Sequence, residues 1–566
     1  MSWRSDIRVI IGLDFGTTFS GFAYCHISDA NDICTNDKWP GEAGQLKTNT
    51  VLQYDSSFTN VEQWGNPALS KRPNRRNKKD SKPIELFKLH LGNLQEHLRP
   101  KLPVNYKKAI TDYLREFGKL INVTINERWN GINFTENVLL VFTVPAEYTE
   151  KDKAIMRECA FNAQLIGDKS SQKLQFTTEP EAAALYCMEN KLKEYDLLTT
   201  GTTFMIVDCG GGTVDLTTRK LIGTKELGEI TERIGDFCGS TFIDTEFVEF
   251  LRGKLGSHAI KLLKENNYGQ YQYIVQEFCR RVKKPFTGED TGFLYELDIE
   301  EVAPVLLQYV NKEIKGLMED NEWLIDIKYN DVKKMFDPVI DRIIRMIHIQ
   351  LLNNQETCSA MFLVGGFSES KYLQKRIRQE FQHRVKTISV PNQPIAAIVR
   401  GATIYGLSLK NSSNTDKMNN LKFVVISTRK LKFTYGVKVF PMWQEGNPPH
   451  RKEEDGRIAI FSQIVKRGTE VKVNQEFGSC FVPVDPNQTG IIFQLYYTTE
   501  YDATYCDDPG MELLGTLSID LPDIHLACAR PVNFGFSFGQ MEITAFAKNK
   551  LNGQNFQTKF DLSTDP

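Results

Sequence analysis

Three glycine-rich segments carry the residues of this sequence that are best suited to chemistry on a phosphate. They are Leu13–Thr18 (L-D-F-G-T-T), Val207–Asp215 (V-D-C-G-G-G-T-V-D) and Leu363–Ser368 (L-V-G-G-F-S). Each follows a short apolar run that predicts a β-strand, so each places glycines where a strand ends. Glycine lets the backbone approach a ligand closely, and the N–H groups of such a turn can bind phosphate oxygens.

Two of these segments also carry a carboxylate at the end of the strand, Asp14 and Asp208. An anion-binding turn beside a carboxylate makes chemical sense when a cation lies between them, and Mg²⁺ prefers oxygen ligands and keeps several waters. Hydroxyl groups of Thr17, Thr18 and Thr213 add oxygens at the same turns. The pattern is neither a Walker A loop nor a dinucleotide-binding turn, so it predicts a magnesium and phosphate site of another kind.

The elements that must position these segments alternate between strand and helix from residue 9 to about residue 410, which predicts an α/β architecture. The pattern predicts a hairpin, a buried strand, a helix and two further strands at Val9–Ile27, Asn137–Val144, Thr149–Gln164, Phe204–Asp208 and Ala360–Val364. Pro180 suits the first turn of a helix that begins at Glu179. Residues 240–350 are mainly amphipathic helix.

The composition changes after Leu409. Lys410–Asn420 is polar and rich in Asn, which is typical of a linker. Beyond it, short β-rich runs such as Phe433–Val439 and Gly490–Thr498 recur, and helical periodicity is scarce. The pattern in residues 421–566 therefore predicts a separate all-β domain of the sandwich type.

The overall composition excludes several classes of protein. Among 566 residues, 69 Lys and Arg balance 71 Asp and Glu, so nothing in the net charge of −2 favours nucleic acid or an anionic membrane. No run approaches the roughly 18 apolar residues that a membrane span needs. The 11 cysteines are scattered and form no C-x-x-C pair, which indicates free thiols and a cytoplasmic protein.

The order of the three segments is similar to the phosphate-1, phosphate-2 and adenosine motifs of the actin-like ATPase superfamily. That superfamily includes actin, hexokinase-type sugar kinases and the 70-kDa heat-shock proteins. The segments that resemble the heat-shock proteins most are Ile11–Ser20, Val141–Ala146, Thr178–Ala184, Val207–Asp215 and Phe362–Ser370. The resemblance covers residues 9–408 well, and its departures resemble the divergent heat-shock 70-kDa protein 12-like branch.

This resemblance implies a two-lobed, actin-like (ribonuclease H-like) α/β ATPase domain at residues 1–409. Lobe I would comprise about 1–200 plus a return near 385–409, and lobe II about 201–384. A linker at 410–420 would lead to a smaller all-β, sandwich-like domain at 421–566. The chain ends soon after this region, so no long helical lid is expected.

The resemblance also implies a site for ATP or ADP with Mg²⁺. Asp14 and Asp208 would hold the metal through water, and Glu179 would help to order those waters. Asp215 or Asp208 would orient or deprotonate the attacking water. The implied nucleotide-binding residues are Gly16, Thr17, Thr18, Gly210, Gly211, Gly212, Thr213, Gly239, Lys283, Lys284, Gly365, Gly366 and Ser368.

One departure concerns the family's catalytic lysine, which follows a G-D-A-A-type segment. Here that segment is Gly65–Ala68, and no lysine stands at the matching position. Lys71 is two positions away in the basic run 71–82, and Lys82 and Lys88 are the alternatives. Loss of the cation would weaken stabilisation of charge on the γ-phosphate, an effect worth about 10²–10³ in rate. We therefore expect slow hydrolysis.

The sequence thus predicts a chaperone-like protein that binds Mg-ATP, hydrolyses it slowly, and closes its lobes on the nucleotide to modulate the β-rich domain. That domain would bind an extended peptide or a protein client, and co-chaperones would be further partners. A pseudo-enzyme that binds nucleotide without chemistry is one alternative. A small-molecule kinase on the same fold is the other, although the sequence offers no separate base for a sugar acceptor. Nothing in the sequence specifies an oligomeric state.

Overall fold

The structure is a computed structural model that describes residues 3–73, 83–92, 94–223, 226–354, 356–411, 425–472, 475–538 and 542–559. The chain divides into two compact units, each built from three segments. Unit 1 comprises Met1–Glu147, Cys159–Thr218 and Ile234–Val424, and unit 2 comprises Tyr148–Glu158, Arg219–Arg233 and Val425–Pro566. The predicted linker at 410–420 lies almost entirely outside the described residues.

The first sheet of unit 1 is built on two buried parallel strands. In β1 (Val9–Phe15) and β10 (Val138–Val144) every residue is buried, as expected for strands that are covered on both faces. β1 also pairs antiparallel with β2 (Phe19–His26), so the predicted hairpin is present. The other strands of this sheet are β11 (Leu174–Thr178), β3 (Cys34–Thr35) and β6 (Thr48–Asn49).

The second sheet carries the other two glycine-rich segments at the ends of neighbouring strands. β12 (Thr203–Cys209) and β18 (Ala360–Val364) run parallel, with Asp208 opposite Val364. Because parallel strands end at the same edge of a sheet, both segments lie at one edge. The other strands are β13 (Val214–Gly223), β15 (Ile234–Asp236), β19 (Thr387–Ser389), β14 (Glu226–Glu229) and β20 (Val425–Ile426).

Two helices fix the position of Glu179. α4 (Glu179–Cys187) follows β11 directly, with Pro180 in its first turn as predicted. α13 (Ala397–Asn411) lies so close to α4 that a Cβ on Gly401 would stand 1.7 Å from the carbonyl oxygen of Ala182. The missing side chain at this glycine therefore lets the two helix backbones touch.

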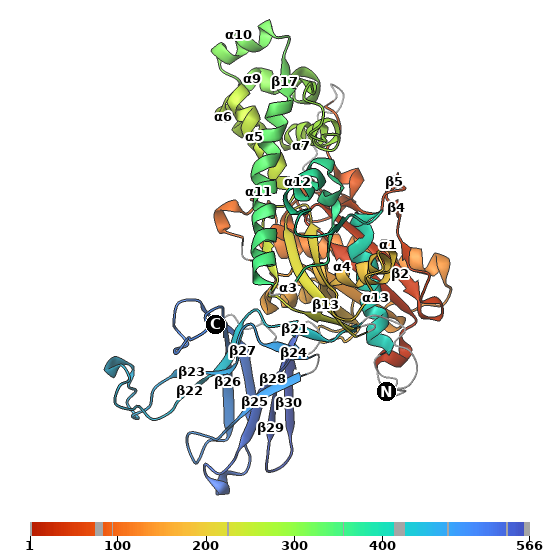
Figure 1. Ribbon diagram of the computed structural model, residues 1–566. Coiled ribbons are helices and arrows are strands. Elements are labelled where there is room, and N and C mark those ends of the chain that lie inside the picture. Colours follow the sequence, from red (N-terminus) through yellow and green to blue (C-terminus); the bar gives the residue numbers. More distant parts are fainter. Residues whose placement is uncertain are drawn as a thin grey trace. The chain divides into compact units, whose positions relative to one another are not determined.

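Residues 241–353 are mainly helical, as predicted, and belong to one large apolar core. Figure 1 shows α11 as a long helix beside the shorter helices α5 and α6. The elements here are α5 (Thr241–Leu255), α6 (Ser257–Asn266), α7 (Tyr268–Phe278), β16 (Leu294–Asp298), α8 (Ile299–Val302), α9 (Leu306–Tyr309), α10 (Lys312–Asp320), β17 (Leu324–Lys328) and α11 (Tyr329–Asn353). α12 (Lys371–Phe381) follows β18.

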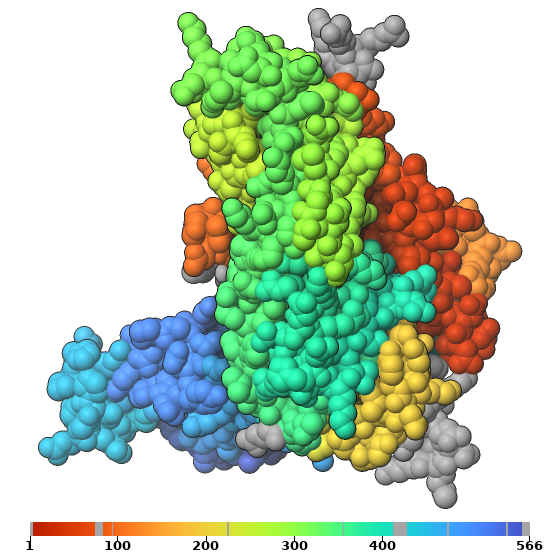
Figure 2. All heavy atoms as spheres, turned by 45° about the horizontal axis from the view of Figure 1, so that its top comes forward, coloured from red at the N-terminus to blue at the C-terminus, as the bar shows by residue number. Residues whose placement is uncertain are grey.

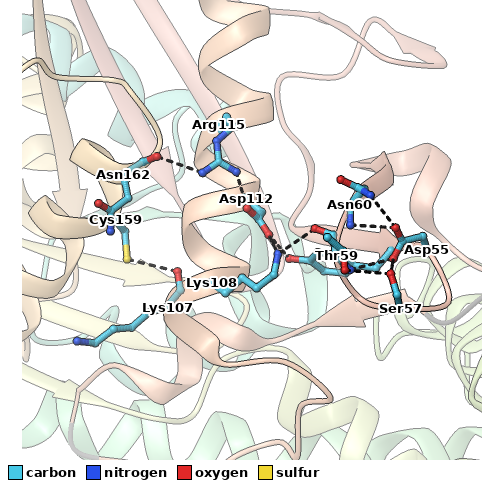
Figure 3. Close-up of polar contacts among 11 residues, drawn as sticks. Asp55, Ser57, Thr59, Asn60, Lys107, Lys108, Asp112, Arg115, Cys159 and Asn162 are labelled. Atoms are coloured by element: carbon cyan, nitrogen blue, oxygen red, sulfur yellow. Dashed lines mark hydrogen bonds and ion pairs between the residues drawn. The ribbon is translucent and has the colours of Figure 1, made fainter.

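Ion pairs within the long helix α1 (Tyr106–Arg128) orient a lysine that bonds to a neighbouring loop (Figure 3). Asp112 accepts hydrogen bonds from Lys108 and Arg115, each with 2.5 Å between nitrogen and oxygen. Lys108 also donates to the carbonyl oxygen of Thr59. These contacts tie α1 to the loop that follows β7 (Val51–Tyr54).

The aromatic face of α1 positions a short helix, η4 (Phe87–His90). Ring centroids of Tyr113 and Phe87 lie 5.9 Å apart, and Phe15 at the end of β1 lies 5.7 Å from Tyr113. All three rings are buried. This cluster fixes the backbone that carries Lys88.

Several short elements complete lobe I. They are β4 (Lys38–Trp39), β5 (Glu42–Ala43), β7, β8 (Val61–Trp64), β9 (Pro83–Glu85) and α2 (Phe134–Asn137). β7, β8 and β9 form one sheet, in which β7 is central.

In the part of the chain that the structure describes, no helix has both the length and the apolarity needed to cross a membrane.

Two four-stranded antiparallel sheets share one apolar core in unit 2. The first contains β23 (Ile460–Val465), β22 (Thr434–Val439), β26 (Gly490–Thr498) and β27 (Met511–Asp520). The second contains β25 (Gln475–Phe481), β28 (Val532–Phe538), β29 (Ile543–Asn549) and β30 (Asn555–Lys559). Phe493 of the first sheet stacks on Phe534 of the second, with 4.3 Å between ring centroids. β21 (Thr428–Lys430) and β24 (Glu470–Lys472) form a separate pair.

Unit 2 also contains polar contacts between segments that are far apart in the sequence. In the middle of α3 (Glu150–Asn162), Arg157 forms a two-pronged ion pair with Glu542, at 2.9 and 2.7 Å. On the segment that contains β14, Glu229 forms ion pairs with Arg219 and Arg233 and accepts a hydrogen bond from the backbone N–H of residue 430. The C-terminal sheets are therefore joined to residues 148–158 and 219–233 by buried ion pairs and hydrogen bonds.

Candidate functional site

The three glycine-rich segments meet at one cavity within unit 1. Its wall includes the turn after β1, the turn between β12 and β13, and the residues that follow β18. The lining residues are Asp14, Gly16, Thr17, Thr18, Phe19, Lys47, Lys88, Glu179, Asp208, Gly210, Gly211, Gly212, Thr213, Gly365, Gly366, Ile395 and Ile398. Local patterns far apart in the sequence therefore contribute to a single site.

The first two glycine-rich turns touch each other across the cavity. A Cβ on Gly211 would stand 2.0 Å from Oγ1 of Thr18, and one on Gly212 would stand 2.8 Å from Oγ1 of Thr17. Gly239 packs against the same turn, because a Cβ added there would lie 2.4 Å from the carbonyl oxygen of Gly211. The site is thus a cradle of bare backbone in which any side chain would displace a neighbour.

Two of the three carboxylates in the cavity are paired with buried lysines. Nζ of Lys47 lies 2.5 Å from Oδ2 of Asp14, and Nζ of Lys88 lies 3.1 Å from Oε1 of Glu179. Oγ1 of Thr143 donates to the second carboxylate oxygen of Asp14 at 3.2 Å. Asp14 is thereby satisfied on both oxygens by the protein itself.

Asp208 differs from the other two carboxylates. Its side chain is 2% exposed, and among the described residues no donor reaches Oδ1. Burial and the nearby carboxylates of Glu179, Asp215 and Asp14 hold its pKa well above the usual range. A buried carboxylate in this state needs a positive charge that the described side chains do not supply.

Glu179 and Asp215 also titrate abnormally because they are buried near other carboxylates. Burial raises the pKa of Glu179, although the cation of Lys88 opposes the shift. Burial and the charges of Glu179 and Glu147 raise the pKa of Asp215 to about 8. Asp215 accepts a hydrogen bond from the backbone N–H of Ala146 at 3.0 Å and does not itself line the cavity.

The structure places three further predicted residues away from the cavity wall. Lys283 donates to the carbonyl oxygen of Ser240 at 2.6 Å and pairs with Asp244 at 2.7 Å, which anchors the start of α5. Lys284 is exposed. Ser368 is buried and donates to the carbonyl oxygen of residue 364. Their assignment to a ligand stays a prediction.

The sequence left Lys71, Lys82 and Lys88 open as the cation of the site, and of these Lys88 lines the cavity. It reaches the cavity from η4, well beyond the position shortly after Gly65–Ala68 where the family pattern places a lysine. Lys71 is exposed, whereas Lys82 lies outside the described residues. No local motif marks Lys88, because packing of the aromatic cluster on α1 places it.

Lys47, Ile395 and Ile398 are lining residues that sequence reasoning missed entirely. Lys47 lies in an irregular segment with no motif. Ile395 stands beside Gly366, whose Cβ would be 3.8 Å from its Cδ1. With Ile398 it gives the third glycine-rich segment an apolar neighbour, which is a suitable surface for a nucleoside base.

The residues present fit a magnesium nucleotide. The backbone cradle and the two lysines suit phosphate oxygens, and the unpartnered Oδ1 of Asp208 suits a cation or a water bound to it. Within the described ranges, no three His, Cys, Asp or Glu side chains converge as a direct metal-binding group. A metal here would be held by Asp208 together with water and phosphate.

Two hydrogen bonds connect segments early in unit 1 to the helix α7 of the same unit. The backbone N–H of Ser70 donates to Oε1 of Gln272 at 2.7 Å, and the hydroxyl of Tyr268 donates to Oε1 of Glu85 at 2.7 Å. Ser70 and Glu85 lie in the first segment of unit 1, whereas the other two residues lie on α7 (Tyr268–Phe278). Figure 2 shows these helical residues adjoining the N-terminal part of the chain. We call this pair of bonds the latch.

Comparison with known proteins gives relatives that align with nearly the whole chain, although no protein-family model matches it. Heat shock 70 kDa protein 12A of Mus musculus is 23% identical over 680 aligned positions, which cover 99% of this chain and 92% of that protein. Heat shock 70 kDa protein 12B of Homo sapiens is 24% identical over 653 positions, with the same two coverages. Chaperone protein DnaK of Mycoplasma mobile is 22% identical and aligns with 73% of this chain and 58% of its own length.

Proposed function

We propose that this chain, which is similar over nearly its whole length to heat shock 70 kDa proteins 12A and 12B, binds ATP and ADP with Mg²⁺ and hydrolyses ATP slowly. The observation that carries the proposal is the convergence of three glycine-rich turns, two lysines and three carboxylates on one cavity. Such a set combines donors for phosphate with acceptors for a hydrated cation.

Each group of residues has a distinct role in this proposal. Backbone N–H groups of the turns at Gly16–Thr18 and Gly210–Thr213 bind the phosphates. Asp208 holds the hydrated Mg²⁺, which neutralises phosphate charge when bound. Asp208 also lines the cavity whereas Asp215 does not, so Asp208 is the better placed of the two to orient an attacking water.

Lys88 favours hydrolysis over a pseudo-enzyme. Its ammonium is buried beside Glu179 in the cavity, where a positive charge can stabilise charge that develops on a transferring phosphoryl group. The argument for slow hydrolysis from a missing cation therefore loses its basis. A different reason for slow hydrolysis is that Lys88 is paired with Glu179. Its ammonium must therefore be shared between Glu179 and the phosphate during the reaction.

The test is calorimetric titration with Mg-ATP and Mg-ADP, followed by single-turnover hydrolysis of labelled ATP on the same preparation. We expect binding of both nucleotides and slow release of phosphate. Lys88→Met should lower the single-turnover rate by about 10²–10³ with a smaller effect on affinity. Lys71→Met is the matched control, because Lys71 is exposed and should leave both quantities unchanged.

Three other outcomes would redirect the proposal. Binding without hydrolysis in the unmodified protein would identify a pseudo-enzyme. A turnover rate that rises only when sugars or polyols are added would identify a small-molecule kinase. Absence of binding for both nucleotides would refute the central proposal.

We further propose that the C-terminal sheets bind a protein or peptide partner under control of the nucleotide site. Large apolar side chains are exposed there, including Val482 (56% exposed), Val484 (43%) and Ile492 (67%). Exposed apolar groups of this kind contribute affinity when a partner covers them. A partner strand could also pair with an edge strand, since β25 and β30 are the edges of the second sheet.

The test compares binding of an unfolded model protein by Ile492→Ser and by Leu317→Ser. Leu317 is a matched control because it is similarly exposed, at 59%, but lies on α10 in unit 1. We expect only Ile492→Ser to weaken binding. Equal effects of the two variants, or none, would remove the C-terminal sheets from the partner site.

A further inference from the structure

Lys47 occupies an unusual position for a lysine in a phosphate-binding cavity. Its side chain is 7% exposed, and its ammonium lies 2.5 Å from a carboxylate of Asp14 that is 3% exposed. It therefore points at the carboxylate nearest the first phosphate-binding turn and not at solvent. A lysine in this place neutralises a charge that a bound metal would otherwise help to neutralise.

The fold makes room for this lysine. Gly21 stands directly opposite Asp14 in the β1–β2 hairpin. A Cβ on Gly21 would lie 2.8 Å from Cγ of Lys47 and 2.9 Å from the carbonyl oxygen of Leu46. The stem of Lys47 thus lies across the bare backbone of β2 to reach Asp14, and a larger residue at position 21 would push it away.

The charges of the cavity are distributed unequally. Among the described lining residues, Lys47 pairs with Asp14 and Lys88 pairs with Glu179, which leaves Asp208 as the carboxylate without a cation. One side of the cradle is therefore already neutral before any ligand binds. Only the side formed by Asp208 requires an added positive charge.

From this distribution we propose that Lys47 is a built-in counter-cation of the phosphate site, so that nucleotide binding depends only weakly on Mg²⁺. The proposal rests on the proposed nucleotide binding. Lys47 shields the phosphates from Asp14 permanently, and Asp208 is the carboxylate that would hold the metal. Removal of Lys47 would leave a buried, uncompensated carboxylate facing the phosphates, a repulsion that only Mg²⁺ could then offset.

The first experiment uses the unmodified protein and titrates it with ADP in excess Mg²⁺ and in EDTA. We expect the dissociation constant in EDTA to be within about thirtyfold of that in Mg²⁺, which is about 2 kcal/mol. A larger loss of affinity in EDTA overturns the proposal without any variant. Absence of ADP binding in Mg²⁺ overturns both this proposal and the proposed function, so the two failures are distinguishable.

The second experiment measures the same ratio of dissociation constants in Lys47→Met. We expect the ratio to rise at least about tenfold, because the loss falls mainly on binding without the metal. The double variant Asp14→Asn with Lys47→Met removes both charges and should return the ratio toward that of the unmodified protein. A ratio in Lys47→Met equal to that of the unmodified protein would contradict the proposal.

Lys191→Met is the matched control. Lys191 is also a buried lysine, 8% exposed, and pairs with Glu194 at 2.5 Å, but it does not line the cavity. Its replacement removes an ion pair of the same length elsewhere in unit 1, although the carboxylate of Glu194 is 52% exposed. We expect the ratio to be unchanged, and a rise equal to that in Lys47→Met would assign the effect to general destabilisation.

Discussion

Asp14, Glu179 and Asp208 lie in one cavity, but their partners differ. Lysines neutralise the first two, whereas Asp208 is buried with an oxygen that no described donor reaches. The cost of removing each carboxylate therefore differs in sign as well as in size. Removal of a paired carboxylate leaves a lysine without its partner, whereas removal of Asp208 relieves a buried charge.

Asp208→Asn tests this difference. We expect Asp208→Asn to lose most of the affinity that the unmodified protein gains on adding Mg²⁺, because the metal loses its carboxylate. The thermal midpoint of the nucleotide-free protein should stay equal or rise, since the raised pKa of Asp208 reflects an unfavourable charge. Calorimetry and thermal unfolding measure the two effects.

Asp14→Asn is the comparison for that prediction. It leaves the ammonium of Lys47 buried and unpaired, so the free energy of unfolding should fall by about 3–5 kcal/mol. Equal destabilisation by the two substitutions would show that the partners in the structure do not determine the energetics.

At the scale of single residues, the sequence predicts that the glycines and the carboxylates belong to the site. It does not predict that the two lysines do. Gly16, Gly211 and Asp208 lie in segments whose local pattern states their chemistry. Lys47 and Lys88 are recognised only once distant segments have packed, because one crosses β2 over Gly21 and the other sits on a helix fixed by α1. Residues placed by packing carry no local pattern.

At the scale of elements, the contact between α4 and α13 positions Glu179. Its closeness depends on Gly401, because any side chain there meets the carbonyl oxygen of Ala182 at 1.7 Å. The helices would have to separate, and α4 would carry Glu179 with it. Close packing makes such shifts costly.

Gly401→Ala should therefore lower the free energy of unfolding by about 1–3 kcal/mol and weaken ADP binding as well. Gly253→Ala is the matched control, because Gly253 lies within α5 and a Cβ there would meet nothing within 4 Å. That substitution should raise stability by about 0.5–1 kcal/mol. Urea unfolding and ADP titration of both variants measure the two effects. A loss in Gly401→Ala without a loss in Gly253→Ala identifies strain at the helix contact and not a general effect of alanine.

The latch is the second feature at this scale. Its two hydrogen bonds join Ser70 and Glu85 to α7, so they must break before α7 can move away from these two residues. Closure of this kind commonly governs ligand release. Tyr268→Phe removes the hydroxyl that donates to Glu85, and with it one of the two bonds.

We expect Tyr268→Phe to accelerate ADP release by about 5–10-fold, as the loss of one hydrogen bond worth about 1 kcal/mol implies. Stopped-flow displacement of a fluorescent ADP analogue measures this rate. Tyr309→Phe is the control, since its hydroxyl bonds to Asn267 within lobe II. An unchanged release rate in Tyr268→Phe would exclude the latch from release.

At the scale of the whole molecule, unit 2 combines three segments that the sequence analysis assigned to different domains. Residues 148–158 and 219–233 were expected to belong to the nucleotide-binding domain, yet they pack with residues 425–566. The alternation of strand and helix predicted most elements, including β10, β12, β18 and β26. It could not predict which segments pack together, because buried ion pairs such as Arg157–Glu542 link positions hundreds of residues apart.

Glu229 gives unit 2 a pH dependence. Burial would raise its pKa, but Arg219 and Arg233 outweigh burial and lower the pKa to about 2. A lowered pKa in the folded state means that the ion pairs stabilise the fold above the ordinary pKa of about 4.5. This stability is lost as the pH falls from about 4.5 toward about 2.

Glu229→Gln should lower the urea midpoint at pH 7, with a loss of about 3 kcal/mol because both arginines lose this buried carboxylate. The difference from the unmodified protein should shrink as the pH falls below about 4.5, because protonation then removes the same charge. A difference that stays constant between pH 7 and pH 3 would contradict the assigned pKa.

The division of unit 2 into three segments has a consequence for the order of events on the ribosome. The segment with β14 is complete by residue 233, but its partner β20 begins at residue 425. At about 5–20 residues per second, synthesis of the intervening chain takes roughly 10–40 s. Throughout that interval β14 keeps an unpaired edge, and Arg157 lacks Glu542. The nascent chain therefore passes through a period in which an exposed strand edge is open to pairing with other chains.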